Sequence, residues 1–114
     1  MSAITTHVLD TGKGIAAAGV PVTLEVRAEG NSFMELGKGT TDKDGRLRDL
    51  MPSGTPLTAG VYRLTFDTSA YFKKSGAKSF FPSVSVTFSV DQTGQHYHVP
   101  LLLSPFGYST YRGT

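Results

Sequence analysis

The sequence predicts an all-β fold, an antiparallel sandwich, from two patterns that run along the chain. Apolar and polar residues alternate with a period of two through most of the 114 residues. Such alternation places the apolar side chains of a strand on one face, toward a core. Clusters of glycine, proline, asparagine and aspartate separate the alternating runs, and these residues favour turns. About seven or eight short strands at this spacing are typical of a sandwich.

The first half of the chain contains three expected strands. The clearest covers 20–27, where every second residue from Val20 to Val26 is apolar. Further strands are expected over 4–9 before it and over 32–40 after it. Residues that tolerate positive φ or preset a turn separate these runs and the next one, at 12–14, 30–31, 42–45 and 52–56.

The next strand, over 61–66, leads into the one segment that does not alternate. This segment predicts a helix over 68–75. It begins with Asp67, a residue type that caps helix N-termini, and it ends with Lys73, Lys74 and Gly76. Glycine commonly terminates helices, and the helix dipole favours cations in the last turn. The start and stop signals therefore agree on about two turns.

Three more strands are expected after the helix. They cover 83–90, 96–103 and 106–111, with a Gln-Thr-Gly-Gln turn at 92–95. In the second of these, Tyr97, Val99 and Leu101 alternate with His96, His98 and Pro100. The two histidines therefore share one strand face, opposite the apolar face.

Length and charge exclude several classes of protein. The chain is long enough for one domain, which we expect to cover residues 1–114. It has no cysteine, which excludes disulfides, thiolate metal ligands and thiol nucleophiles. Eleven basic residues against nine acidic ones give a net charge of +2, and the basic residues are scattered, which disfavours a nucleic-acid partner.

We expect no membrane segment, because no run approaches the roughly 20 apolar residues that span a bilayer. The first residues lack the basic region and apolar run of a signal peptide, so we expect a cytoplasmic protein, or a periplasmic one if a leader was removed.

Three histidines carry the most chemistry, and residue patterns leave three interpretations of them open. His7, His96 and His98 could be surface or interface residues, ligands of a zinc site, or acid–base groups that activate water. In the last case an arginine would hold an anionic or carbonyl-bearing substrate, and Arg46 and Arg112 are the candidates. A Gly-x-Ser-x-Gly elbow and a glycine-rich phosphate loop are both absent from the sequence.

Three segments carry a resemblance to a known family. They are Thr5–Thr11 with Gly19–Val22, then Thr41–Arg46, and finally the run from His96 to Thr114, which ends in Tyr-Arg-Gly-Thr. Over essentially its full length the chain resembles the 5-hydroxyisourate hydrolases of the transthyretin-related family. That resemblance implies a sandwich of two four-stranded antiparallel sheets with one short helix around 68–75. It also implies a homotetramer, a dimer of dimers, with active sites in the channel between dimers.

The resemblance implies a reaction as well. Family members open the cyclic amide of 5-hydroxyisourate, a product of urate oxidation, to 2-oxo-4-hydroxy-4-carboxy-5-ureidoimidazoline. We expect histidine-activated water to do this here, with no metal and no cofactor. The alternative is a non-catalytic carrier of the transthyretin type, which binds a small molecule in the tetramer channel.

The residues implied by the resemblance lie at both ends of the chain. The expected catalytic set is His7, Arg46, His98 and Thr114, and the expected substrate-binding residues are Tyr111, Arg112 and Gly113. His96 shares a face with His98 but is outside the family's set. Thr114 departs from the family's terminal serine: the hydroxyl is kept, but a methyl group is added and χ1 becomes stiffer.

Overall fold

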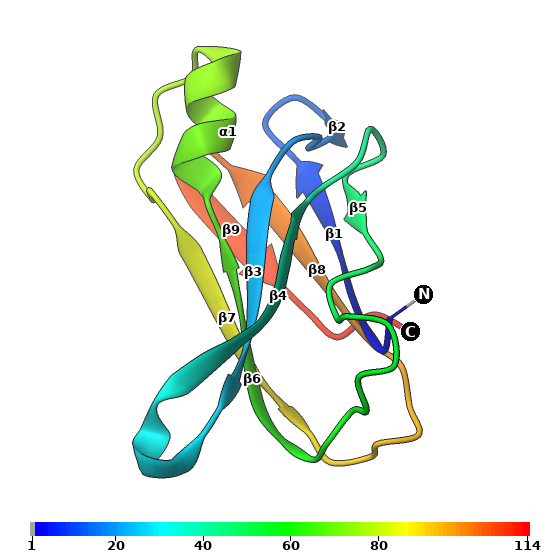
Figure 1. Ribbon diagram of the computed structural model, residues 1–114. Coiled ribbons are helices and arrows are strands. Elements are labelled where there is room, and N and C mark those ends of the chain that lie inside the picture. The colour runs from blue at the N-terminus through cyan, green and yellow to red at the C-terminus, as the bar shows by residue number, and fades with distance from the viewer. Residues whose placement is uncertain (1) are drawn as a thin grey trace.

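The protein folds into two β-sheets packed face to face, with a short helix at one end (Figure 1). The structure is a computed structural model that describes residues 2–114. Its elements, in chain order, are β1 Ile4–Asp10, β2 Ile15–Ala16, β3 Pro21–Arg27, the 3₁₀ turn Glu29–Asn31, β4 Phe33–Thr40, β5 Arg46–Leu47, β6 Gly60–Phe66, α1 Thr68–Ser75, β7 Val84–Val90, β8 Tyr97–Ser104 and β9 Gly107–Thr110.

The two sheets have the strand orders β4-β3-β6-β7 and β2-β1-β8-β9, and β5 joins the second sheet by pairing with β1. The expected all-β sandwich with one short helix is confirmed. Two details differ from the expectation of purely antiparallel, four-stranded sheets. β1 and β8 are parallel, and the second sheet has five strands.

Both differences have physical causes. Almost the whole chain lies between β1 and β8, so no tight hairpin forces them to run in opposite directions. β2 and β5 have two residues each, too few to show an alternating pattern.

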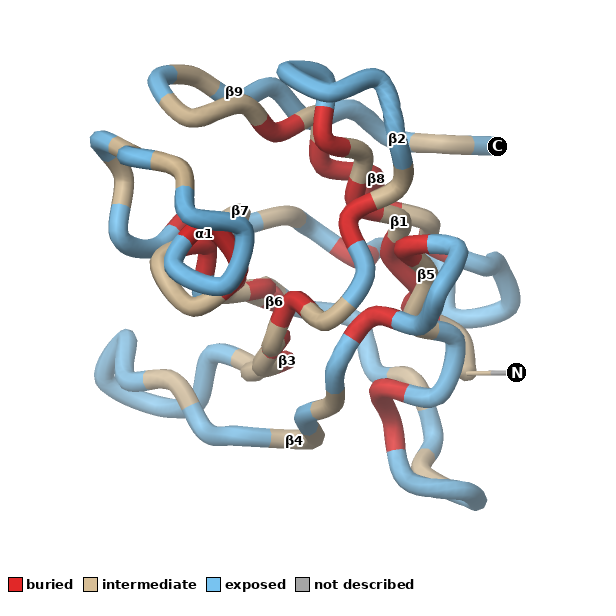
Figure 2. The backbone as a smooth tube through the Cα atoms, turned by 90° about the horizontal axis from the view of Figure 1, so that it is seen from above, coloured by how far each residue is buried: buried red, intermediate tan, exposed pale blue. Residues whose placement is uncertain are grey.

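The core lies between the two sheets and follows the predicted alternation. Figure 2 shows the buried segments of β1, β6 and β8 gathered in the middle of the molecule, while the turns are exposed. On β8 the side chains of Tyr97, Val99 and Leu101 are buried, and on β3 those of Val22 and Leu24 are buried. The opposite face of β8 is therefore free to carry polar chemistry.

The helix α1 has the predicted limits and the predicted caps. The Asp67 carboxylate accepts a hydrogen bond from the backbone N–H of Ala70 at 3.0 Å, and Gly76 adopts φ 72° at the C-terminal end. Tyr71 donates its phenol hydrogen to the carboxylate of buried Asp10 at 2.7 Å. Burial, together with this carboxylate, raises the pKa of Tyr71 to about 12. The hydrogen bond ties the helix to the end of β1.

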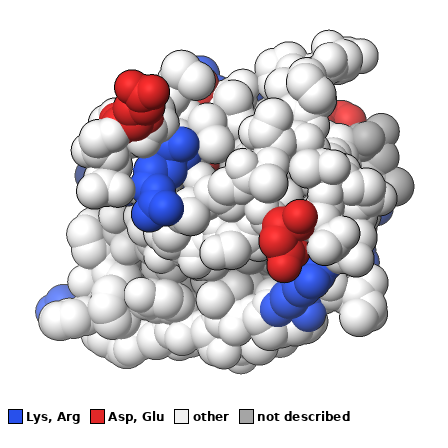
Figure 3. All heavy atoms as spheres, turned by 90° about the horizontal axis from the view of Figure 1, so that it is seen from below, with Lys and Arg blue, Asp and Glu red and all other residues white. Residues whose placement is uncertain are grey.

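No helix in residues 2–114 combines the length and the apolar character that a membrane crossing requires. The face drawn in Figure 3 carries basic and acidic side chains near one another, without a continuous basic patch.

Candidate active site

Strand pairing on the outer face of the second sheet brings the expected catalytic residues together. Thr5 of β1 is aligned with His98 of β8, and His7 is aligned with Arg46 of β5. Because side chains alternate along β1, Thr5 and His7 point to the same face, away from the buried Ile4 and Val8. Figure 1 shows the three strands next to one another, with β1 between β5 and β8.

A tight turn places Arg46. One carboxylate oxygen of Asp42 accepts hydrogen bonds from the backbone N–H groups of Asp44 and Arg46, at 2.8 and 3.0 Å. The backbone hydrogen bond from Arg46 is the main reason that the pKa of Asp42 is lowered. Gly45 adopts φ 75°, and a Cβ there would lie 2.4 Å from the carbonyl oxygen of Val8. A glycine is therefore required for the turn to approach β1 so closely.

His7 contacts the same turn. Its Nε2 lies 2.9 Å from the carbonyl oxygen of Asp44. A carbonyl oxygen can only accept a hydrogen bond, so the neutral ring carries its proton on Nε2. The lone pair of the ring is then on Nδ1.

His98 is held on β8 by a hydroxyl group of β1. Its Nδ1 lies 2.8 Å from Oγ1 of Thr5, and Nε2 of His96 lies 3.0 Å from the same oxygen. Burial lowers the pKa of His98, and the nearby charges of Arg46, His96 and His7 lower it further. The lowered pKa favours the neutral form of His98, from which a general base acts.

Arg46 and His98 line a cavity of about 190 Å³ on the outer face of the sheet. Its lining residues are Thr5, Thr6, Arg46, Arg48, His96, His98 and Thr114. Two guanidinium groups and two imidazoles around one cavity suit a planar ligand with carbonyl oxygens or negative charge. The volume is below the roughly 300–1,000 Å³ typical of small-molecule sites.

The C-terminal segment closes one side of this cavity. The backbone N–H of Gly113 donates to the carbonyl oxygen of His98 at 2.8 Å. A Cβ at position 113 would lie 2.6 Å from Cδ2 of His98, so only glycine allows this approach without a shift. Gly113 thereby brings Thr114 to the cavity wall.

Two of the expected substrate-binding residues lie elsewhere in the single chain. Tyr111 and Arg112 line a separate groove of about 230 Å³, with residues of β7 and β8. The guanidinium group of Arg112 donates to Oε1 of Gln95 at 2.8 Å and lies 4.5 Å from the ring centroid of Tyr97. Arg112 is therefore not a wall of the His98 cavity within one protomer, and a substrate contact of either residue stays a prediction.

The structure brings Arg46, His98 and Thr114 to one cavity, with His7 aligned beside Arg46. Sequence reasoning missed Thr5 and Arg48. Both lie two residues from an expected site residue on an extended segment, Thr5 from His7 and Arg48 from Arg46. That period-two spacing is the signal that could have found them.

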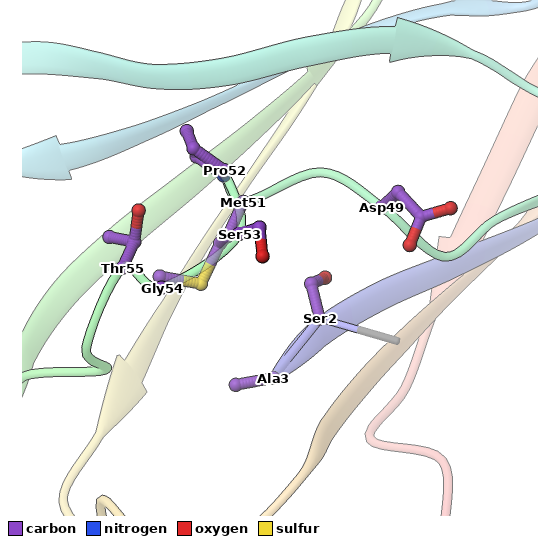
Figure 4. Close-up of a pocket in the computed structure, with 8 residues that line it drawn as sticks. All are labelled: Ser2, Ala3, Asp49, Met51, Pro52, Ser53, Gly54 and Thr55. Carbon is purple, nitrogen blue, oxygen red and sulfur yellow. The ribbon is translucent and has the colours of Figure 1, made fainter.

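A larger cavity, about 480 Å³, lies between the start of β1 and the loop before β6 (Figure 4). It is lined by Ser2, Ala3, Asp49, Met51, Pro52, Ser53, Gly54 and Thr55. Asp49 is the one titratable side chain among these residues, and none of the expected site residues lies there. The chemistry of the molecule is concentrated at the smaller cavity.

Comparison with known proteins places this chain in a family. The model of the HIUase/Transthyretin family matches residues 4–113. A 5-hydroxyisourate hydrolase of Salmonella dublin is 44% identical over 111 residues, covering 97% of this chain and 80% of that protein.

Two solved structures have the same fold. The 5-hydroxyisourate hydrolase of Klebsiella pneumoniae has a TM-score of 0.82 and 39% identity, over 97% of this chain and 98% of that one. Sea bream transthyretin, in complex with thyroxine, has a TM-score of 0.91 and 31% identity, over 99% and 96% of the two chains. The chain belongs to the HIUase/Transthyretin family.

Proposed function

We propose that this protein is a 5-hydroxyisourate hydrolase that opens the cyclic amide of its substrate in urate degradation. The observation that carries the proposal is the cavity in which His98, with its lowered pKa, lies with the guanidinium group of Arg46 and with Thr114. The names of the hydrolases of Salmonella dublin and Klebsiella pneumoniae support the same activity.

In the proposed reaction, water supplies the nucleophile and His98 is the base. Nε2 of His98 takes a proton from water as the water oxygen forms a bond to the amide carbon. Nδ1 of His7, which carries the lone pair of that ring, positions the water. Arg46 donates hydrogen bonds to the carbonyl oxygen as it becomes negative, and its planar fork of donors suits a planar heterocycle.

The tetrahedral intermediate then collapses. The bond between carbon and ring nitrogen breaks, and the proton held on His98 moves to the leaving nitrogen, so the base returns to its starting form. Thr114 orients water or substrate by hydrogen bonding.

We propose that the reaction needs no metal. The donor set around His98 supports this. Among residues 2–114, no three His, Cys, Asp or Glu side chains come together in a way that could hold a metal ion. Zinc sites normally use three or four such ligands.

We also propose that the active form is a homotetramer, a dimer of dimers, with the site in a channel between dimers. Each sheet of the protomer ends in an open edge strand, β7 in one and β9 in the other. Unpaired edges are available for pairing with another chain. The small volume of the His98 cavity is consistent with a site that a second copy enlarges.

A carrier function is the rival, and the similarity to sea bream transthyretin favours it. Fold alone does not decide between the two functions. The lining does favour hydrolysis, because imidazole and guanidinium groups are suited to activating water and holding an oxyanion.

The test is hydrolysis of freshly generated 5-hydroxyisourate, followed by the loss of its ultraviolet absorbance against the spontaneous rate. We expect the wild type to accelerate the decay and His98→Asn to lower kcat by at least about 10²-fold while leaving the fold intact. Saturable binding of the substrate without any acceleration would show a carrier and overturn the proposal.

A further inference from the structure

A buried hydroxyl group connects His98 of β8 with His96, which directly precedes that strand. Thr5 is 3% exposed, and its Oγ1 lies within hydrogen-bonding distance of Nδ1 of His98 and Nε2 of His96. These are the two partners of Oγ1 among the described residues. The rings of the two histidines are stacked, with centroids 6.3 Å apart. Neither Thr5 nor His96 belongs to the expected catalytic set.

The number of hydrogens available for these two hydrogen bonds restricts the tautomer of His98. A hydroxyl group has one hydrogen to donate, and each neutral imidazole has one N–H. A buried hydroxyl hydrogen needs an acceptor, and the two rings are its partners, so one ring must accept from Thr5 while the other donates to it. The pair of hydrogen bonds can therefore form in two directions. In one direction, Nδ1–H of His98 donates to Thr5, and Thr5 donates to Nε2 of His96. In the other direction, Nε2–H of His96 donates to Thr5, and Thr5 donates to Nδ1 of His98.

The two directions have opposite consequences for catalysis. In the first, Nε2 of His98 carries a lone pair and can take a proton from water. In the second, Nε2 already carries a hydrogen and cannot act as a base. His98 can thus act as a base in the first direction and cannot in the second, and the direction in which the Thr5 hydroxyl donates decides which tautomer forms.

The charges around the cavity favour the first direction. Arg46 and Arg48 line the cavity together with His98. The ring nitrogen that Thr5 leaves free is Nε2. A lone pair on that nitrogen is stabilised by nearby guanidinium charges, whereas an N–H dipole pointing toward them is not. His96 is exposed, so its Nδ1–H can be hydrated in this arrangement.

We propose that Thr5 is a positioning residue that, with His96 as its acceptor, holds His98 as the Nδ1–H tautomer with Nε2 free to act as the base. The catalytic part of this inference rests on the proposed hydrolase function. When Nε2 takes the proton of water, Nδ1–H of the resulting imidazolium still donates to Thr5, now as a stronger, charge-assisted hydrogen bond. The charged and titratable groups that act on His98 are Arg46 of β5, His96 just before β8 and His7 on β1, and Arg48 lines the same cavity.

The first test measures the tautomer directly in the wild type, without reference to activity. Imidazole ¹⁵N shifts of the full-length protein distinguish a protonated from an unprotonated ring nitrogen. We expect Nδ1 of His98 to be protonated and Nε2 to be unprotonated above the pKa of the ring. A neutral His98 with its hydrogen on Nε2 overturns the proposal.

The second test removes the hydroxyl group. Thr5→Val keeps the shape of the side chain, Thr5→Ser keeps the hydroxyl, and Thr11→Val is a matched control. Thr11 follows β1 and donates to the carbonyl of Leu103 at 3.2 Å, outside the cavity lining. We expect Thr5→Val to lower kcat by at least about tenfold with little change in KM, to shift the acid limb of the pH profile and to mix the tautomers of His98. Thr5→Ser should restore all three quantities, and Thr11→Val should leave them unchanged.

The outcomes separate this inference from the function on which it rests. Equal kcat and an equal pH profile in the wild type and in folded Thr5→Val, with activity lost in His98→Asn, would disprove the role of Thr5 and keep the hydrolase. A wild type without hydrolysis would disprove the function, while the ¹⁵N spectrum still decides the tautomer. If Thr5→Val does not fold, the tautomer of the wild type still decides the proposal.

Discussion

The contact between Gly113 and the ring of His98 leads to a quantitative prediction for Gly113→Ala. A Cβ at position 113 would lie 2.6 Å from Cδ2 of His98 and 3.3 Å from Cγ. Carbon atoms normally approach to about 3.5–4.0 Å, so the overlap with Cδ2 is on the order of 1 Å. Gly113 is not among the residues with positive φ, so this close approach is the main strain that alanine introduces.

Either the ring or the C-terminal segment must move by about that overlap. The ring is held by the hydroxyl of Thr5, whereas the segment is held at this point by one backbone hydrogen bond of 2.8 Å. We expect the segment to move and to carry Thr114 away from the cavity. A misplacement of about 1 Å can lower a rate by roughly 10²-fold, whereas losing one hydrogen bond at an exposed segment destabilises the fold by only about 0.5–1.5 kcal/mol.

The assay is kcat for 5-hydroxyisourate hydrolysis, with urea unfolding to measure stability. Gly94→Ala is the matched control, because a Cβ at position 94 meets no atom within 4 Å and its φ is not positive. We expect the control to match the wild type in both measurements. Wild-type kcat in Gly113→Ala would refute the reasoning, and so would a loss of activity that merely follows global unfolding.

Three further predictions concern pH, a buried hydrogen bond and the arginine fork. The pKa of His98 in the free protein is lowered and the base is the neutral form, so kcat/KM should stay on its plateau as pH falls through the ordinary histidine value of about 6.5 and should decline only below it. A profile of kcat/KM against pH checks this, and a decline centred above that value would contradict it. Tyr71→Phe leaves one oxygen of the buried Asp10 carboxylate without its donor, so we expect the free energy of unfolding in urea to fall by about 1.5–3 kcal/mol with kcat unchanged. The control Tyr108→Phe, whose side chain is exposed, should lose no stability. Equal stability of both variants would show that the hydrogen bond is unimportant. Arg46→Lys keeps the charge and the backbone turn but removes the planar guanidinium group, so we expect kcat/KM to fall by at least about tenfold in the hydrolysis assay. A wild-type kcat/KM would exclude the guanidinium group as the oxyanion donor.

Local patterns in the sequence predicted much of the fold because the interactions behind them are local. The alternation in β8 identified which side chains enter the core, since successive residues of a strand point to opposite faces. The cap residues Asp67 and Gly76 marked the limits of α1, since a helix end is satisfied by groups within a few residues of it. β2 and β5 were missed because two residues are too few for any period to appear.

The candidate site could be predicted only in part, because it is formed by strands that are far apart in the chain and the predictive patterns are local. His7, Arg46, His98 and Thr114 were expected from a resemblance in sequence, and the structure brings three of them to one cavity with His7 adjacent to it. For the hydroxyl of Thr5 and the guanidinium group of Arg48 the sequence offered only a period-two spacing from His7 and Arg46. Their importance appears only when strands far apart in the chain are paired.

The sequence by itself determined where the longer strands form, where the helix begins and ends, and which face of β8 is polar. The tertiary structure alone decided that β1 and β8 run parallel, that Thr5 is aligned with His98, and that Arg112 contacts Gln95 instead of the His98 cavity. The physical reason is distance along the chain. Periodicity and capping depend on neighbouring residues, whereas register between strands some 90 residues apart depends on how two whole sheets bury their apolar faces together.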